Sequence, residues 1–260
     1  MSESNQNIMK RTISRAFIGI AAAVLALASC QKEEELRRFN VTMGNIVDGR
    51  FVSDQGNTFN IVEQLCPARL DTMTRALVNC DVIRQTAGKE KEYDIRLTQI
   101  FSVLTKDVLY KSSEPSESTL GNDAIHIEYL WISGGYMNMS IIIPVKNGVG
   151  GRKHLINLVH DDTDMKDNTF IFHIRHNAYG EILGANNSDK TLVRQYVSFP
   201  VSSVINQDSA MIELHWKGYK AFPGGLSSET EDYRVQRGYL KSEFEQVPTT
   251  ITGMMTTSID

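Results

Sequence analysis

The ten residues FHIRHNAYGE, Phe172–Glu181, bring together the side chains best suited to chemistry: two His, an Arg, a Tyr and a Glu. Paired imidazoles near a carboxylate could carry acid–base catalysis, or bind zinc if three or four ligands converge. His154 and His160 lie earlier in the chain and could join them. Residues three apart in a β-strand face opposite sides, so His173 and His176 are not expected to share an ion unless a bulge intervenes.

A strand that ends in a turn explains the same stretch without any catalytic role. Alternation places three apolar residues in the core and the residues between them, among them His173, on the other face. The expected core residues are Phe170, Phe172 and Ile174. Asn177 and Gly180 tolerate left-handed conformations, which favours a turn after the strand. In that turn His176 and Tyr179 would hydrogen-bond to loop backbone, so we interpret the stretch as a fold marker.

Four aspartates follow His160 within the stretch HDDTDMKDN. Their oxygens could hold Ca²⁺, but the spacing, glycine and terminal Glu of an EF-hand are absent, so a solvated hairpin turn is favoured. The sequence also lacks GxSxG, HExxH, P-loop and dinucleotide-binding patterns. A Ser–His–Asp triad forms only in space, and no local signature nominates one. We therefore predict no enzyme activity, no cofactor and no metal ion.

Three aromatic residues, Trp131, Tyr136 and Trp216, are the candidates for a ligand surface. Aromatic faces can stack on a sugar ring, although packing in a core or an interface is their commoner role. The sequence leaves both alternatives open.

The N-terminus has the pattern of a secretory signal. Lys10, Arg11 and Arg15 are followed by an apolar run, Ala16–Ala28, that is too short to span a bilayer. The ending LASC resembles a bacterial lipobox, which implies cleavage before Cys30 and lipidation of that residue. Several acyl chains on one residue would give stable anchoring. The alternative is an ordinary cleavage site followed by a chance Cys.

The acidic run QKEEE, Gln31–Glu35, is either a solvated spacer or an address. It resembles the signal that sends lipoproteins of some Gram-negative anaerobes to the outside of the outer membrane. We therefore predict an outer-membrane lipoprotein that is held by lipid on Cys30 and exposed at the cell surface. Its partner would be an envelope or extracellular protein or glycan. The formal net charge of −4 and the lack of a basic stripe argue against nucleic acid.

Two further cysteines, Cys66 and Cys80, could form a disulfide in such an oxidising compartment. The alternative is a pair of buried free thiols, which pack as small hydrophobes. Neither CxxC nor a His at ligand spacing accompanies them, so they do not predict a metal site.

The sequence predicts that β-strands carry these candidate residues. Runs of alternating apolar and polar residues, such as EYDIRL from Glu92, are separated by turns rich in Gly, Asn and Asp. The predicted fold class is all-β, with a small OB-like barrel followed by an antiparallel β-sandwich. The expected divisions are a signal (1–29), an acidic tether (30–38), an OB-like domain (39–104), a linker (105–123), a sandwich (124–246) and a frayed tail (247–260).

Several stretches, in order over roughly residues 39–219, resemble the NigD-like lipoproteins. They include TLGND (Thr119–Asp123), IEYLWISGGYMNMSI (Ile127–Ile141), KHLINLV (Lys153–Val159) and FHIRHNAYGE. The resemblance implies an N-terminal OB-like domain and a C-terminal β-sandwich. The family is named for an operon linked to a bacteriocin, and an immunity role has been proposed for it. No established reaction comes with the family, so no catalytic residues are carried over, and Glu181 stands where Asp is more usual.

Two functions remain open. The first is a lipid-anchored, non-enzymatic binding or protective module with an immunity-like role, which predicts a broad interaction surface. The alternative is a surface carbohydrate-binding lipoprotein in glycan capture, which predicts an exposed aromatic platform near Trp131 or Trp216. A hydrolase would need a deep cleft with paired carboxylates. We favour the first function.

Overall fold

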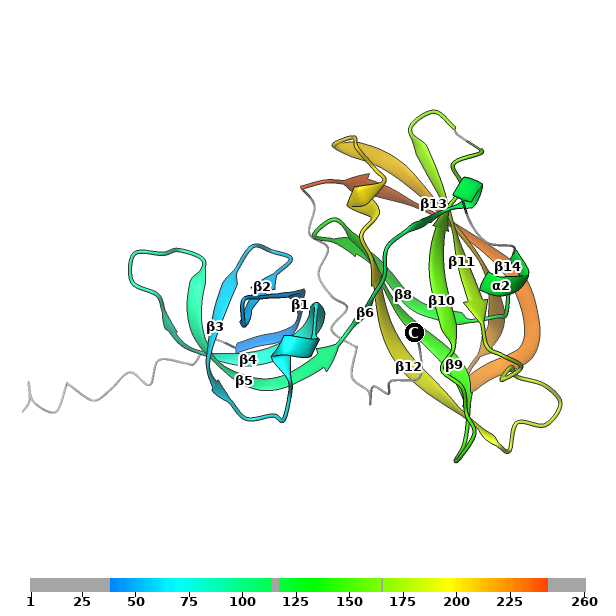
Figure 1. The fold of residues 1–260 in the computed structure, drawn as a ribbon, viewed down its shortest axis with the longest axis horizontal. Helices are drawn as coiled ribbons and strands as arrows, with labels where there is room; N and C mark the ends of the chain where they lie inside the picture. Colours follow the sequence, from blue (N-terminus) through cyan, green and yellow to red (C-terminus); the bar gives the residue numbers. More distant parts are fainter. Residues whose placement is uncertain (1–37, 114–116, 165, 243–260) are drawn as a thin grey trace, which may run out of the picture. The chain divides into compact units, whose positions relative to one another are not determined.

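A computed structural model describes residues 38–113, 117–164 and 166–242 of the chain (Figure 1). The predicted all-β class is confirmed, because the described elements are strands joined by short helical turns. The signal, Cys30, the acidic run and the tail from residue 247 lie outside the described residues. No helix among the described residues is long and apolar enough to cross a membrane.

The first domain is a closed five-stranded barrel with the strand order β1-β2-β3-β5-β4. Its strands are β1 (Arg38–Val47), β2 (Arg50–Ser53), β3 (Thr58–Gln64), β4 (Arg75–Gln85) and β5 (Glu92–Ser102). The β3–β5 pair is parallel and the other pairs are antiparallel. Alternation fills the interior, since Tyr93, Ile95 and Leu97 of β5 are buried against Phe51 and Phe59. Closure by five strands makes this the predicted OB-like barrel.

The second domain is a sandwich of two sheets. One sheet has the order β14-β13-β11-β10-β7, and the other has the order β6-β12-β9-β8. The longer strands are β8 (His126–Ser133), β9 (Tyr136–Lys146), β10 (Leu155–His160), β11 (Thr169–Asn177), β12 (Lys190–Phe199), β13 (Ser209–Phe222) and β14 (Gly225–Leu240). Phe170, Phe172 and Ile174 lie in the core between the sheets, as alternation predicts.

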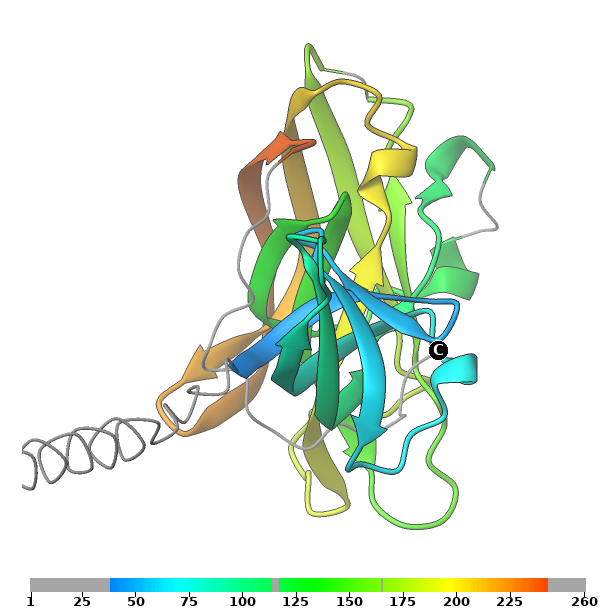
Figure 2. The same cartoon turned by 90° about the vertical axis from the view of Figure 1, so that its left-hand side faces the viewer.

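The sandwich is not purely antiparallel, because β13 pairs with β11 in parallel. The β13–β14 hairpin also runs on past the end of its pairing with β11, and Figure 2 shows it projecting in orange. Its tip exposes Phe222.

The segment expected to be a linker, residues 105–123, contributes to both sheets. The β6 strand (Leu104–Thr105) pairs with β12, and β7 (Leu109–Tyr110) pairs with β10. A short helix, α2 (Glu117–Leu120), follows. Strands of two residues are too short to show an alternating pattern, so composition alone suggested a linker.

Barrel and sandwich share a hydrophobic cluster. Met43 of β1 and Leu77 of β4 pack with Trp131 of β8 and Tyr196 of β12, and Val103 joins them. All five side chains are buried.

A buried arginine crosses the same boundary. Arg75 of β4 is fully buried and pairs with Asp54 through two hydrogen bonds, of 2.8 and 2.6 Å. On the sandwich, it donates to Ser198 Oγ at 3.1 Å and to Asn138 Oδ1 at 3.1 Å. A fully hydrogen-bonded charge of this kind specifies one arrangement of the residues around it.

Candidate binding sites on the barrel and the sandwich

His154 and His176 contact each other, and both are buried. Nδ1 of His154 lies 3.0 Å from Nε2 of His176, and both rings are almost inaccessible. Glu181 accepts hydrogen bonds from the backbone N–H groups of Lys146 and Arg152, each at 2.8 Å, and its Oε2 lies 3.4 Å from His154 Nε2. This network joins the loop after β9 to the loop after β11, which agrees with a structural role for the stretch.

Burial keeps this network free of protonated histidine at neutral pH. Burial, together with the neighbouring His154, lowers the pKa of His176 to about 4. Burial also lowers the pKa of His154, against the opposing effect of Glu181. Burial alone would raise the pKa of Glu181, but the backbone hydrogen bonds outweigh it and the pKa falls.

A second histidine pair lies on the outward side of the five-stranded sheet. His173 of β11 and His215 of β13 are directly paired in register, with ring centroids 5.0 Å apart. Nε2 of His173 is 3.6 Å from Asp161, and Nε2 of His215 is 2.7 Å from Glu213. Both imidazoles are partly exposed. We call this pair, with Arg175 and Lys217, the histidine face.

The carboxylates beside the histidine face already have cationic partners. Lys111 pairs with Asp161 at 2.6 Å. Arg234 pairs with Glu213 at 3.0 Å, and Gln236 donates to the same carboxylate at 2.7 Å.

These contacts set the pKa values of the groups involved. Hydrogen bonds from Gln236 and His215 lower the pKa of Glu213 to about 2. Burial opposes ionisation of Asp161, but its hydrogen bonds from Lys111 and Thr163 hold its pKa well below the usual range. Burial lowers the pKa of His173, and the charges of His215 and Arg175 add to this.

An open pocket of about 240 Å³ lies on the histidine face. It is lined by Asn122, His173, Ile174, Arg175, His215, Trp216, Lys217, Asp232 and Tyr233. Four of these residues are cations or can become cations, and Asp232 is the single carboxylate. The arrangement can therefore donate several charge-assisted hydrogen bonds to a ligand.

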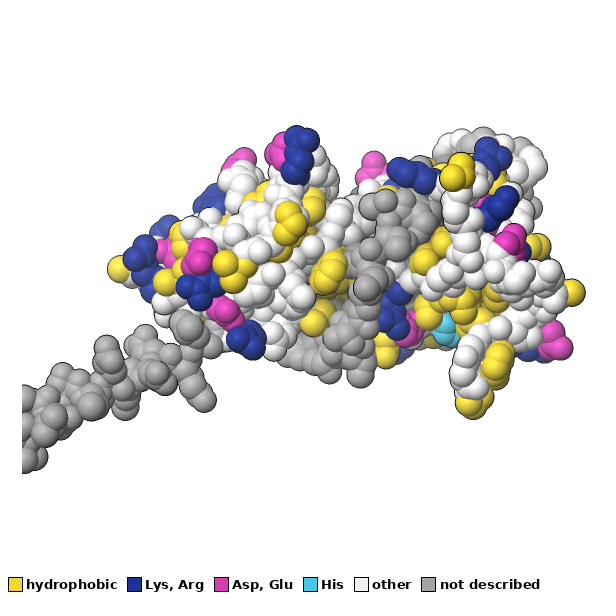
Figure 3. Space-filling model, turned by 90° about the horizontal axis from the view of Figure 1, so that it is seen from below, with side chains coloured by type: hydrophobic (Ala, Val, Ile, Leu, Met, Phe, Trp, Pro, Cys, Tyr) yellow, Lys and Arg dark blue, Asp and Glu magenta, His cyan; other side chains and the backbone are white. Residues whose placement is uncertain are grey.

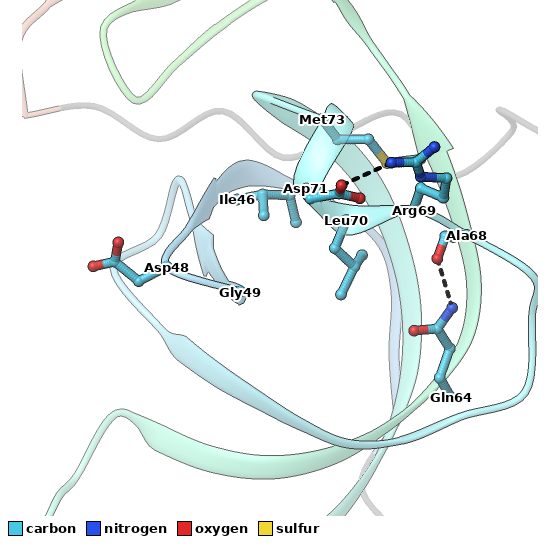
Figure 4. A pocket seen from close by; sticks show the side chains of 9 residues that line it. All are labelled: Ile46, Asp48, Gly49, Gln64, Ala68, Arg69, Leu70, Asp71 and Met73. Carbon is cyan, nitrogen blue, oxygen red and sulfur yellow. Dashed lines mark hydrogen bonds and ion pairs between the residues drawn. The ribbon is translucent and has the colours of Figure 1, made fainter.

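A larger hollow, of about 650 Å³, lies on the barrel (Figure 4). Its lining residues are Ile46, Asp48, Gly49, Gln64, Ala68, Arg69, Leu70, Asp71 and Met73. Leu70 points into the hollow, whereas Asp48 points away from it. Arg69 and Asp71 pair with each other at 3.0 Å. The hollow can accept an apolar group, but it lacks a convergent set of titratable groups.

The structure does not bring the three predicted ligand residues together. Trp131 is 2 % exposed and packs in the cluster shared by barrel and sandwich. Tyr136 lies under the guanidinium of Arg75, 4.0 Å from the ring centre. Trp216 is in the other sheet and stacks on Tyr233, with centroids 5.2 Å apart and planes 12° apart. These three residues therefore do not form one aromatic platform, although Trp216 lines the pocket on the histidine face.

Cys66 and Cys80 are free thiols in the structure, so the disulfide alternative is not realised. Cys80 lies in the barrel core, and burial raises its pKa to about 12. Among the described residues, no group of three or more His, Cys, Asp or Glu could hold a metal ion. Asp162, one of the aspartates that follow His160, instead accepts hydrogen bonds from the backbone N–H and the hydroxyl of Ser112.

Acidic and basic side chains are interspersed on the surface of the barrel shown in Figure 3. That distribution is unlike the basic stripe of a nucleic-acid-binding surface.

The fold places this chain among two-domain all-β proteins that join a closed OB-like barrel to a β-sandwich. Residues 108–229 match the family model described as the NigD-like C-terminal beta sandwich domain. The match confirms the predicted resemblance to the NigD-like family over the sandwich domain. No curated protein matches the chain significantly.

Solved structures share the fold across both domains. A protein of unknown function from Bacteroides vulgatus is 21% identical, with a TM-score of 0.54, over 77% of this chain and 91% of that one. A NigD-like immunity protein from Bacteroides caccae is 14% identical, with a TM-score of 0.54, over 80% and 99% of the two chains. A candidate lipoprotein from Bacteroides fragilis is 15% identical, with a TM-score of 0.55, over 80% and 100%. At these identities the likeness establishes the fold.

Proposed function

We propose that this chain is a lipid-anchored lipoprotein of the cell envelope that acts as a non-enzymatic binding or protective module. The observation that carries the proposal is the joining of two β-domains by Arg75 and the Trp131 cluster, together with an open pocket on each domain. Preorganised surfaces of this kind suit recognition, because little conformational entropy is lost when a partner binds.

The anchor part of the proposal rests on the LASC ending and Cys30. It is supported by the candidate lipoprotein of the same fold from Bacteroides fragilis. In a Bacteroides host, the wild-type chain should fractionate with membranes and a Cys30→Ser variant should not. Equal membrane retention of the two chains would overturn the anchor.

The proposed exposure at the cell surface rests on the acidic run after Cys30. Protease added to intact cells should digest the wild-type chain but spare a variant with Glu33, Glu34 and Glu35 replaced by Ala. Protection of both chains would place the protein on the periplasmic side and direct the search for a partner to the envelope interior.

The protective role is proposed from the NigD-like sandwich and from the immunity protein of similar fold. Host cells that carry the wild-type chain should survive a bacteriocin-producing neighbour better than cells with the Cys30→Ser variant. Survival that is the same with and without the chain would contradict an immunity role against that bacteriocin.

A further inference from the structure

We propose that the pocket on the histidine face binds a compact oxyanion, a phosphate or carboxylate group, through Arg175, Lys217 and the two imidazoles. This inference concerns a ligand and does not depend on the envelope role. It starts from the pocket of about 240 Å³, whose size suits one such group and not an extended chain.

Two permanent cations stand at the pocket. Arg175 of β11 lies two residues beyond His173, and Lys217 of β13 lies two residues beyond His215, so all four side chains share the outward face. Nη1 of Arg175 donates to Asn122 at 3.3 Å, which orients the guanidinium beside the pocket. A planar guanidinium can present two parallel donors to a phosphate or a carboxylate.

Lys217 has no ion-pair partner within 4.0 Å in the described part of the chain, although Asp232 is opposite it in the β13–β14 register. Two other carboxylates near the histidine face already have partners among the described residues, since Asp161 pairs with Lys111 and Glu213 pairs with Arg234. The pocket therefore has more cationic than anionic groups facing it.

The imidazole of His173 can add to this excess. At neutral pH His173 is uncharged, because its pKa lies below the usual value through burial and through the charges of His215 and Arg175. A bound oxyanion would favour the imidazolium form and raise that pKa. Binding should therefore be accompanied by proton uptake and should strengthen as the pH falls from 7.5 to 5.5.

A metal ion fits the same groups less well. The two imidazoles are accompanied by Arg175 and Lys217, whose charges would repel a cation. The described residues also offer no set of three metal ligands.

The test is a titration of the full chain, purified in detergent, with sodium phosphate and separately with sodium acetate, followed by calorimetry and by NMR of the His C2–H signals. We expect binding that shifts the signals of His173 and His215 and tightens about tenfold from pH 7.5 to 5.5. Tighter binding of phosphate would indicate a phosphorylated ligand, and tighter binding of acetate an acidic one. Unmoved signals of both histidines with both anions would overturn the proposal.

Variants can distinguish a specific binding site from a general electrostatic attraction of anions. Lys217→Gln and Arg175→Gln should each weaken binding about tenfold, because each removes a charge-assisted hydrogen bond. Lys220→Gln is the matched control, since Lys220 lies on the same strand and pairs with Glu229. Lys217→Arg should retain binding, which would show that loss in Lys217→Gln is not misfolding. Equal affinities in Lys217→Gln and Lys220→Gln would contradict the site.

Discussion

Arg75 is the residue on which the contact between barrel and sandwich depends most. Replacing it by Ala leaves the Asp54 carboxylate, which is almost fully buried, without its cation. Removing one partner of a buried ion pair costs about 3–5 kcal/mol, so the free energy of unfolding of Arg75→Ala should fall by that amount. Urea unfolding measures it. The exposed Arg69–Asp71 pair provides the control, because Arg69→Ala should leave the midpoint unchanged.

His176 makes the stability depend on pH. Its pKa is about 4 in the folded chain and near the ordinary 6.5 when unfolded, so the unfolded state takes up a proton first. The stability is therefore complete above pH 6.5 and is lost as the pH falls towards 4, by about 3 kcal/mol. Urea midpoints of the wild type and His176→Gln across this range give the test. A variant with the same slope as the wild type would refute the assignment.

The pairing of β1 with β2 in the barrel depends on a glycine in β1. A Cβ on Gly44 would lie 2.2 Å from the carbonyl oxygen of Val52 and 2.7 Å from Cα of Ser53, both backbone atoms of β2 and its end. Gly44→Ala should therefore cost about 1–3 kcal/mol through displacement of the β1–β2 pair. A Cβ on Gly238 of β14 would meet nothing within 4 Å, so Gly238→Ala is the matched control. Thermal melting compares them, and equal melting temperatures would contradict the close approach.

The buried faces of the strands are predictable from the sequence, whereas the pairing of the strands is not. Alternation correctly indicates the buried faces of β5 and β11, because each face is fixed by local residue order. The histidine face is not predictable in that way. His173 and His215 meet because β13 pairs with β11 in parallel while β12 joins the other sheet, and nothing in either strand encodes that choice. Trp131 likewise gives no local sign that a second domain covers it.

For the whole molecule, the shared cluster predicts that barrel and sandwich unfold together. Trp131 and Trp216 are the two tryptophans of the chain, so Trp216→Phe leaves Trp131 as the sole reporter of the cluster. Its fluorescence and the far-ultraviolet circular dichroism should then change at the same urea concentration. A fluorescence change that precedes the loss of strand signal would mean that the two domains separate before they unfold.

We propose that this molecule works at the cell envelope on a lipid anchor. The intact mass and N-terminal sequence of the chain isolated from membranes of a Bacteroides host would show whether the anchor is present. We predict a mature chain that begins at Cys30 and carries acyl chains on that residue. A chain that begins elsewhere, or that carries an unmodified Cys30, would rule out the proposed lipid anchor.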